Sequence, residues 1–347
     1  MRLPLFAFLS LLLIPQTALA AILAIDYGSE WIKASLVKPG TPFDVLLNKD
    51  SKRKIQASVG WKREDRVFGQ DAFSLVRPQR PRRSLFFFEY FFFFAQAARF
   101  PQDSFSHVKY LQGVPYDSEL TRHFRQIQAC PLAPTSRKTV GLVPSSSGGG
   151  GGGGTTATAW AAEDLIAMQL SYVKQLAESY TDGEKVRDVI VTVPPFYTQF
   201  ERDAVVDAIE IAGLKTLALV NDGTAVAVHY AAARTFAKPE IHVIYDAGAS
   251  SIRATAVQFS TGSLDGSGKK GGVEGPQVTV MGVGYDRSAG GTELDRRMRE
   301  ILIEGFNVKH GRDVRQDAKG MAKLWKEAGR VKAILSANSD ATAQVNF

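Results

Sequence analysis

Residues 22–37 read ILAIDYGSEWIKASLV, two apolar stretches joined by an acidic turn that contains glycine. This pattern predicts a β-hairpin that places Asp26, Gly28 and Ser29 together at the end of a strand. Glycine lets the backbone approach phosphate oxygens, exposed N–H groups point at negative charge, and a carboxylate can hold a hydrated magnesium ion. Taken alone, the motif is more typical of an ordinary hairpin with an acidic turn.

The same pattern returns 220 positions later, where residues 241–257 read IHVIYDAGASSIRATAV. The repeat sets Asp246 against Asp26 and Gly248 against Gly28. Two phosphate-type hairpins at domain-scale separation predict a duplicated α/β fold, with a nucleotide held between two similar lobes.

Length and composition agree with two lobes, because 347 residues with 45% hydrophobic content can bury a sizeable core. The net charge of +7 is partly local to residues 77–96. A basic stripe with interleaved aromatic residues is absent from the sequence, so no nucleic-acid partner is expected. The single cysteine, Cys130, excludes an internal disulfide and a cysteine-rich zinc site.

The N-terminus has the pattern of a secretory signal peptide over residues 1–20. Arg2 precedes the apolar run Leu3–Ile14, and the small residues Ala18 and Ala20 follow it. The run is too short to span a bilayer, so no transmembrane segment is expected. A buried first strand is the alternative interpretation.

Two stretches break the regular pattern. Residues 77–96 contain eight aromatic residues between Phe86 and Phe94 without a helical or strand period, and residues 145–154 are three serines and seven glycines. Both are interpreted as insertions on a regular fold, the first as retained intron sequence or, alternatively, a loop that touches a membrane.

Regular elements surround the two hairpins. A strand at 189–193 precedes a helix that opens on the capping box of Thr198 and Glu201, and the strand at 217–220 delivers Asp222 at its carboxyl end, where α/β sheets bind ligands. A glycine pair at 290–291 precedes another helix. Further expected elements are a strand at 43–47 and a helix at 318–335 whose apolar stripe is core packing: Met321, Leu324, Trp325, Ala328, Val331 and Leu335.

In this order, the motifs resemble the actin-like ATPase fold, which is ribonuclease H-like, and more closely the nucleotide-binding domain of the heat shock protein 70 family. The matching stretches, over about two-thirds of the chain, are IDYGS, VIVTVPPFYTQFER, IAGLKTLALVNDGTA, YDAGAS and AGGTELD. The form DYGSEWIK and the N-D-x-T sequence are similar to the large endoplasmic-reticulum branch, that of the glucose-regulated 170-kilodalton protein. The resemblance implies a first lobe at 21–220 and a second lobe at 221–347.

The resemblance also implies ATP and Mg²⁺ as cofactors and a role for each matching residue. Asp26 and Asp246 would hold magnesium through water, and Asp246 would also act in catalysis. Asp222 stands in place of the family's catalytic glutamate. Lys109 matches the lysine at the γ-phosphate, although a solvated side chain is the alternative. The remaining nucleotide contacts would be Gly28, Ser29, Gly248, Ala249, Gly290 and Gly291 at the phosphates, and Lys332 and Ser336 at the adenosine. Pro194 and Arg202 match residues that relay the nucleotide state.

Departures from the family pattern put fast hydrolysis in doubt. Asp222 is one methylene shorter than the usual glutamate, and Gly329 replaces a glutamate that contacts adenosine. Arg253 stands where conventional members have a second aspartate, so it is interpreted either as a cation near the metal site or as an exposed strand residue like Lys33. The family's domain would continue past Phe347, so we expect an incomplete second lobe and a missing substrate-binding domain.

The predicted function is that of an ATP-binding chaperone in the endoplasmic reticulum lumen, whose polypeptide clients bind through the missing domain. The alternative is a weakly hydrolysing nucleotide-exchange partner of the conventional lumenal chaperone, and Arg253 favours it. A sugar or acetate kinase on the same fold is the third possibility. It is less favoured because fold alone does not assign function and because the IAGL and NDGT motifs resemble the chaperones.

Overall fold

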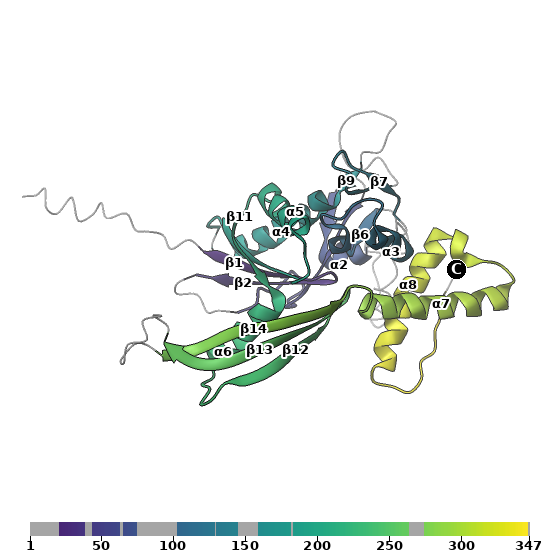
Figure 1. Ribbon diagram of the computed structural model, residues 1–347. Helices are drawn as coiled ribbons and strands as arrows, with labels where there is room; N and C mark the ends of the chain where they lie inside the picture. The colour runs from purple at the N-terminus through teal and green to yellow at the C-terminus, as the bar shows by residue number, and fades with distance from the viewer. Residues whose placement is uncertain are drawn as a thin grey trace, which may run out of the picture.

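A five-stranded sheet forms the centre of the computed structural model, which describes residues 21–38, 44–62, 65–74, 103–128, 130–144, 159–181, 183–263 and 274–345 (Figure 1). The strand order is β11-β10-β1-β2-β3. β1 runs parallel to β10 and antiparallel to β2, and β10 runs parallel to β11. The bounds are Ile22–Tyr27 for β1, Trp31–Val37 for β2, Ile55–Gln56 for β3, Asp188–Val193 for β10 and Lys215–Asn221 for β11.

Helices α4 (Ala162–Ser179) and α5 (Gln199–Ile211) pack against each other and against this sheet. Their buried side chains meet Leu23 and Ile25 of β1 in the main hydrophobic core. α5 begins at the predicted capping box, because the Thr198 side chain accepts from the N–H of Glu201 while the Glu201 carboxylate accepts from the N–H of Thr198. The strand, helix and strand units therefore form where the sequence predicted them.

A second sheet repeats the antiparallel meander of the first. It consists of β12 (Glu240–Ala247), β13 (Ile252–Ser263) and β14 (Glu274–Asp286) in that order. The register pairs Asp246 with Arg253, as the first hairpin pairs Asp26 with Lys33. The predicted mixed α/β fold is confirmed.

Helix α6 (Asp222–Ala232) lies between the two sheets and contacts strands of both (Figure 1). It covers one face of the second sheet, where Ala227 and Ala231 pack with Val257 and Phe259.

Smaller elements complete the first part of the chain. β4 (Ser58–Lys62), β5 (Asp65–Phe68) and β6 (Ser104–Ser106) form one small sheet, and β7 (Leu132–Pro134), β8 (Val140–Leu142) and β9 (Trp160–Ala161) form another. The helices beside them are α2 (Gly69–Ser74), α3 (Glu119–Ile127) and the 3₁₀ turn η1 (Val108–Leu111).

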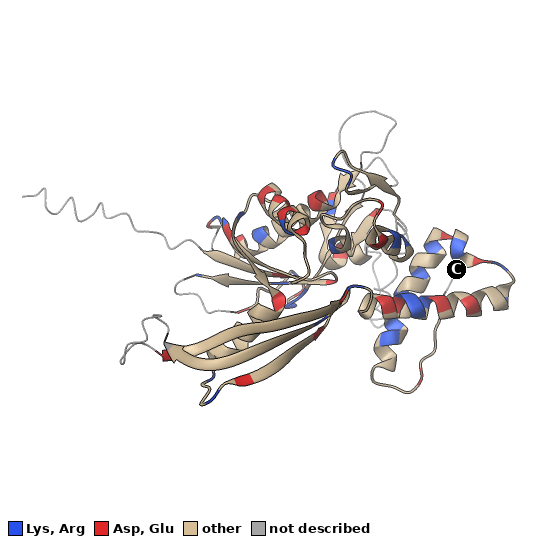
Figure 2. Ribbon diagram, in the orientation of Figure 1, with Lys and Arg blue, Asp and Glu red and all other residues tan. Residues whose placement is uncertain are grey.

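The C-terminal helices α7 (Gly291–His310) and α8 (Ala318–Leu335) pack against each other and extend away from the sheets (Figure 1). The short 3₁₀ turn η2 (Val314–Gln316) connects them. Charges of both signs are interspersed on this pair, where Arg296 and Arg297 both contact Glu293 (Figure 2). The pair is tied to the rest by Arg299, whose guanidinium lies 5.0 Å from the Trp325 ring and donates to the carbonyl of Gln126 in α3.

Two local predictions were wrong. The helix at 318–335 forms with the predicted bounds, and Leu324, Ala328 and Val331 are buried, but Leu335 is 39% exposed because it lies at the helix end beyond the core. The predicted strand at 43–47 is reduced, in residues 44–47, to a single bridge between Val45 and Ser35.

Several predictions fall on other parts of the chain. The signal peptide at 1–20 and the insertions at 77–96 and 145–154 lie outside the described residues. Within the described residues, none of the helices has the length and apolar character needed to cross a membrane.

Candidate functional site

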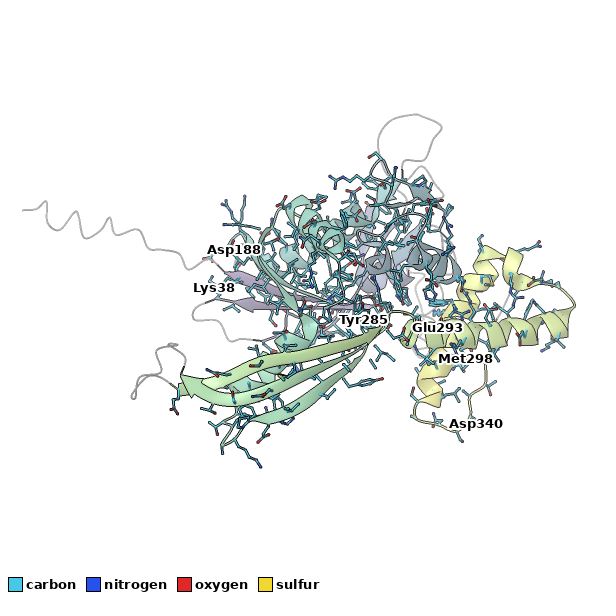
Figure 3. The ribbon with its side chains drawn as sticks, viewed as in Figure 1. Lys38, Asp188, Tyr285, Glu293, Met298 and Asp340 are labelled. Carbon is cyan, nitrogen blue, oxygen red and sulfur yellow. The ribbon has the colours of Figure 1, made fainter. Side chains whose placement is uncertain are left out.

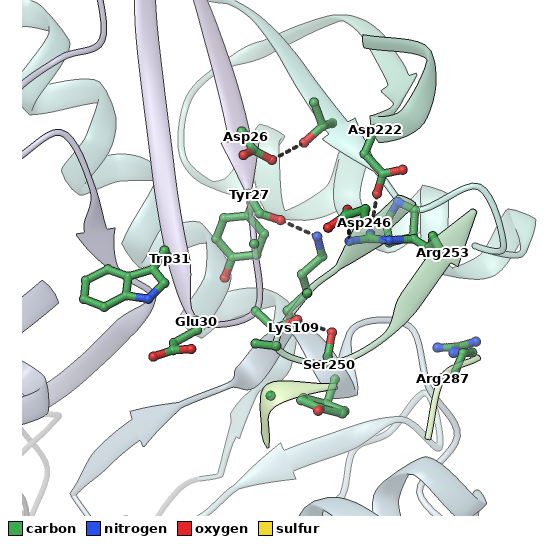
Figure 4. A pocket seen from close by; sticks show the side chains of 18 of the residues that line it. Asp26, Tyr27, Glu30, Trp31, Lys109, Asp222, Asp246, Ser250, Arg253 and Arg287 are labelled. Carbon is green, nitrogen blue, oxygen red and sulfur yellow. Dashed lines mark hydrogen bonds and ion pairs between the residues drawn. The ribbon is translucent and has the colours of Figure 1, made fainter. Parts of the chain in front are cut away.

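A cavity of about 440 Å³ lies between the turns of the two duplicated hairpins (Figure 4). Its walls come from the β1–β2 turn, η1, the carboxyl end of β10, the start of α6 and the β12–β13 turn. Ligand pockets typically measure some 300–1,000 Å³, so the volume suits a small molecule of nucleotide size. Of the sequence-predicted site residues, those that line it are Asp26, Gly28, Ser29, Lys109, Asp222, Asp246, Gly248, Ala249 and Gly291.

The two hairpin turns contain the same backbone hydrogen bond and touch each other. The N–H of Gly28 donates to the carbonyl of Trp31, and that of Gly248 to the carbonyl of Ser251, both at 3.0 Å. A methyl group on Gly28 would lie 2.5 Å from the Trp31 oxygen, so the first turn requires glycine for close approach. The hydroxyls of Ser29 and Ser250 lie 2.6 Å apart across the cavity wall.

The predicted carboxylates face the cavity, and all are paired with cations. Asp26 accepts from the Thr192 hydroxyl at 2.9 Å and from the Lys33 ammonium at 3.1 Å. Arg253 donates to both Asp222 and Asp246, one guanidinium nitrogen to each (Figure 4). Arg253 is therefore not an exposed strand residue.

Lys109 reaches the cavity from η1, and its ammonium donates to the carbonyl of Tyr27. Burial lowers the pKa of Lys109 to about 8, although the nearby carboxylates, Asp26 first, favour the charged form. Burial also raises the pKa of Asp222, and the Arg253 charge opposes that shift. Both groups belong to one electrostatic network, since each contributes to the other's pKa.

Backbone hydrogen bonds next to the glycine pair before α7 connect that helix to the second hairpin. The N–H groups of Gly291 and Thr292 donate to the carbonyls of Gly248 and Ala249, at 3.0 and 2.9 Å. Gly290 is not among the cavity-lining residues, and a methyl group there would lie 2.5 Å from the Ala249 oxygen. Figure 3 shows Tyr285 and Glu293 on either side of this junction.

The two residues expected at the adenosine lie outside the cavity lining. Lys332 donates to the carbonyl of Gly291 at 3.0 Å and pairs with Asp295 at 2.7 Å, so it adjoins the glycine turn. Ser336 is exposed, and its hydroxyl donates to the carbonyl of Lys332 within α8. Lys332 therefore lies near the site, whereas Ser336 lies away from it.

Sequence reasoning missed several lining residues. Arg287 extends from the end of β14, pairs with the buried carboxylate of Glu201 at 2.6 Å and lies 4.7 Å from the Phe196 ring. Local motifs carry no signal for this contact, because it joins segments 86 positions apart. Of the two residues expected to relay the nucleotide state, Pro194 lines the cavity, whereas Arg202 is not among the lining residues and donates to the Asn221 side chain at 3.1 Å.

Cations and carboxylates balance in the lining, with four of each: Lys33, Lys109, Arg253 and Arg287 against Asp26, Glu30, Asp222 and Asp246. Positive side chains and turn N–H groups can bind phosphate oxygens. Within the described residues, groups of three or more His, Cys, Asp or Glu arranged to hold a metal ion are absent. The magnesium contacts expected of Asp26 and Asp246 stay a prediction.

Known proteins resemble this chain over most of its length. It is 35% identical to Hypoxia up-regulated protein 1 of Xenopus laevis over 350 residues, which cover 98% of this chain and 48% of that protein. The human protein of the same name is 34% identical over 353 residues, with 98% and 32% covered. Heat shock protein 70 homolog lhs1 of Schizosaccharomyces pombe is 33% identical over 329 residues, with 94% and 35% covered.

The chain spans about half the length, or less, of these curated relatives. The pattern of the family described as Hsp70 protein matches residues 95–347. That range exceeds half of the chain and contains Lys109, Asp222 and the second hairpin. The nucleotide-binding domain of that family has the actin-like ATPase fold found here. The chain therefore belongs to the Hsp70 family.

Proposed function

We propose that the cavity binds ATP and that the chain supplies the nucleotide-binding part of an Hsp70-type chaperone. The observation that carries the proposal is the meeting of the two hairpin turns and Lys109 around one cavity of about 440 Å³. Family membership supports a nucleotide as the ligand. The triphosphate is the part of ATP that this lining suits, because cationic side chains and the hydroxyls of Ser29 and Ser250 line the cavity.

Each lining group has a proposed task. Gly28, Ser29, Gly248 and Ala249 would contact the phosphates from the two turns, and Lys109 would neutralise the γ-phosphate. Asp222, at the start of α6, would orient the attacking water, because its carboxylate lies at the cavity wall. Gly290, Gly291 and Lys332 would fix the position of α7 and α8 beside the nucleotide.

Magnesium fits only part of this lining. Asp26 is half-exposed and its Lys33 partner is equally exposed, so a hydrated ion could approach it. Asp246 is paired with Arg253 and could not hold the ion while that pair persists. No catalytic step is therefore assigned to a metal held by the protein.

The endoplasmic reticulum lumen is the proposed location, on the strength of the signal-peptide pattern at residues 1–20 and the similarity to the relatives named above. Unfolded or nascent polypeptides are the proposed clients of the whole protein, and the conventional lumenal chaperone is its proposed partner. The comparisons do not favour the alternative of a weakly hydrolysing exchange partner.

Calorimetric titration of the full chain with ATP and ADP tests nucleotide binding. We expect saturable binding at one site, and a loss of about tenfold or more in affinity for Lys109→Ala, which removes a buried charge beside the phosphates. Lys49→Ala, which alters an exposed lysine paired with Asp71, is the matched control and should bind as the wild type does. Absence of binding by the folded wild-type chain would overturn the proposal.

A further inference from the structure

Arg253 holds two carboxylates at once. Its strand register sets it directly across from Asp246, and the start of α6 brings Asp222 to the other side of the same guanidinium. The Arg253 side chain is 13% exposed and that of Asp222 is 17% exposed. A planar guanidinium can bridge two carboxylates with separate N–H groups, which a lysine cannot do with the same geometry.

The equivalent pair in the first hairpin is different. Lys33 contacts Asp26 at 3.1 Å, and the two side chains are 54% and 50% exposed. An exposed pair of this kind contributes little and exchanges readily with ions from solution. Separating Arg253 from Asp222 would instead leave two largely buried charges unpaired, which is costly, whereas the Asp246 side chain is 44% exposed. The ion pair of Arg253 in the second hairpin is therefore expected to persist, whereas the Lys33–Asp26 pair in the first hairpin exchanges with ions from solution.

The charge balance of the lining points the same way. With Arg253 between them, Asp222 and Asp246 carry a net charge of −1, which attracts a divalent cation less than two free carboxylates would. An aspartate at position 253 would change the balance by two units toward negative, which is the charge that one divalent cation neutralises.

We propose that Arg253 takes the place of a divalent cation between Asp222 and Asp246. The carboxylate pair then excludes metal, and the phosphates of a bound nucleotide meet a fixed guanidinium instead of a metal ion held by the protein. The exclusion of metal stands on the ion pairs alone, whereas the statement about phosphates rests on the proposed function.

Titration of the full chain with Mn²⁺ alone, followed by electron paramagnetic resonance, tests the exclusion. Wild type should bind Mn²⁺ about tenfold or more weakly than Arg253→Asp, which frees both carboxylates and adds a third. Arg253→Gln frees the carboxylates without adding one, so it should fall between the two and serves if Arg253→Asp melts early in circular dichroism. Arg137→Gln, which breaks the exposed pair with Asp207, is the matched control.

A second titration uses ADP in buffers that contain either MgCl₂ or EDTA. We expect wild-type affinity to change by less than about threefold between the buffers and the affinity of Arg253→Asp to fall by about tenfold or more in EDTA. Mn²⁺ binding by wild type as tight as that of Arg253→Asp, or a tenfold loss of wild-type ADP affinity in EDTA, would overturn the proposal. If ADP binds to none of these folded proteins in either buffer, the proposed function fails, and the Mn²⁺ titration still decides the role of Arg253.

Discussion

Lys109 shows how burial tunes one side chain of the site. Its ammonium is enclosed by the carbonyl of Tyr27 and the rings of Tyr27 and Tyr197, at 5.6 and 5.9 Å. Asp26, Asp222 and Asp246 favour its charged form, and Arg253 and desolvation disfavour it. Because desolvation is the largest effect, the pKa falls to about 8, within reach of ordinary buffers.

This pKa predicts a pH dependence of nucleotide affinity. Below about pH 8 Lys109 is charged and ATP affinity should be constant, and above it ATP affinity should fall by up to about tenfold per pH unit as the ammonium loses its proton. Calorimetric titrations between about pH 7.5 and 9.5 measure this. Lys109→Arg should remove the dependence, because arginine stays charged; a wild-type profile as flat as that of Lys109→Arg would contradict the prediction.

His107 makes a second prediction, about stability. Burial lowers its pKa to about 4, against 6.5 for an exposed histidine, so the folded protein keeps it neutral. The unfolded chain therefore binds more protons between these values, and about 3 kcal/mol of unfolding free energy should be lost as the pH falls from 6.5 to 4. Urea unfolding at several pH values measures the loss.

His107→Asn is the matched variant, because His107 has a φ of 57° and asparagine tolerates that left-handed conformation. The variant should lose less stability than the wild type over the same pH range. Equal slopes for the two proteins would show that other groups dominate acid unfolding.

At the scale of elements, the start of α5 joins two parts of the molecule. Glu201 is buried, and one carboxylate oxygen closes the capping box while the other accepts from Arg287 at the end of β14. The helix start is thus tied both to its own first turn and to the second sheet. A single side chain couples local helix formation to the packing of β14 against the first part of the chain.

Two variants separate these contributions. Thr198→Ala should cost about 1 kcal/mol of unfolding free energy, the usual value for an N-cap. Glu201→Ala should cost about 2 to 3 kcal/mol, because it removes the cap and leaves Arg287 unpaired. Gln199→Ala, in the exposed first turn, is the control and should stay within about 0.5 kcal/mol of wild type. Equal costs for Thr198→Ala and Glu201→Ala in urea unfolding would rule out the coupling.

At the scale of the whole molecule, the two sheets differ in how they are covered. α4 and α5 pack against the first sheet, whereas α6 covers one face of the second sheet (Figure 1). Ile241, Val243 and Tyr245 are 65–67% exposed and lie on one face of that strand, because alternate residues of a strand point to the same side.

Such an apolar face should bind a hydrophobic dye. We expect the full chain to enhance the fluorescence of 1-anilinonaphthalene-8-sulfonate, and the double variant Ile241→Thr, Val243→Thr to reduce the enhancement by about half while the melting temperature stays unchanged. Threonine is suitable because it keeps the β-branched shape. Undiminished dye fluorescence in the double variant would place the apolar surface elsewhere.

The sequence by itself determined the features that depend on short separations. Asp26 and Lys33, and likewise Asp246 and Arg253, are seven positions apart, and a tight hairpin of strand period two must then place each pair side by side. The capping box of α5 and the bounds of α8 follow from equally local spacing. Membership of the duplicated fold was therefore predictable from two short motifs and their order.

Only the tertiary structure decided the contacts between distant segments. The bridge from Arg253 to Asp222 spans 31 positions, the Arg287–Glu201 pair 86, and the contact between Ser29 and Ser250 221. These contacts depend on how α6 and the second sheet pack against the first sheet. The relative position of packed elements is determined by the side chains of the whole core. For the same reason Ser336, the residue after α8, lies outside the cavity. The sequence left both roles of Arg253 open, and packing decided between them by burying its guanidinium between two carboxylates.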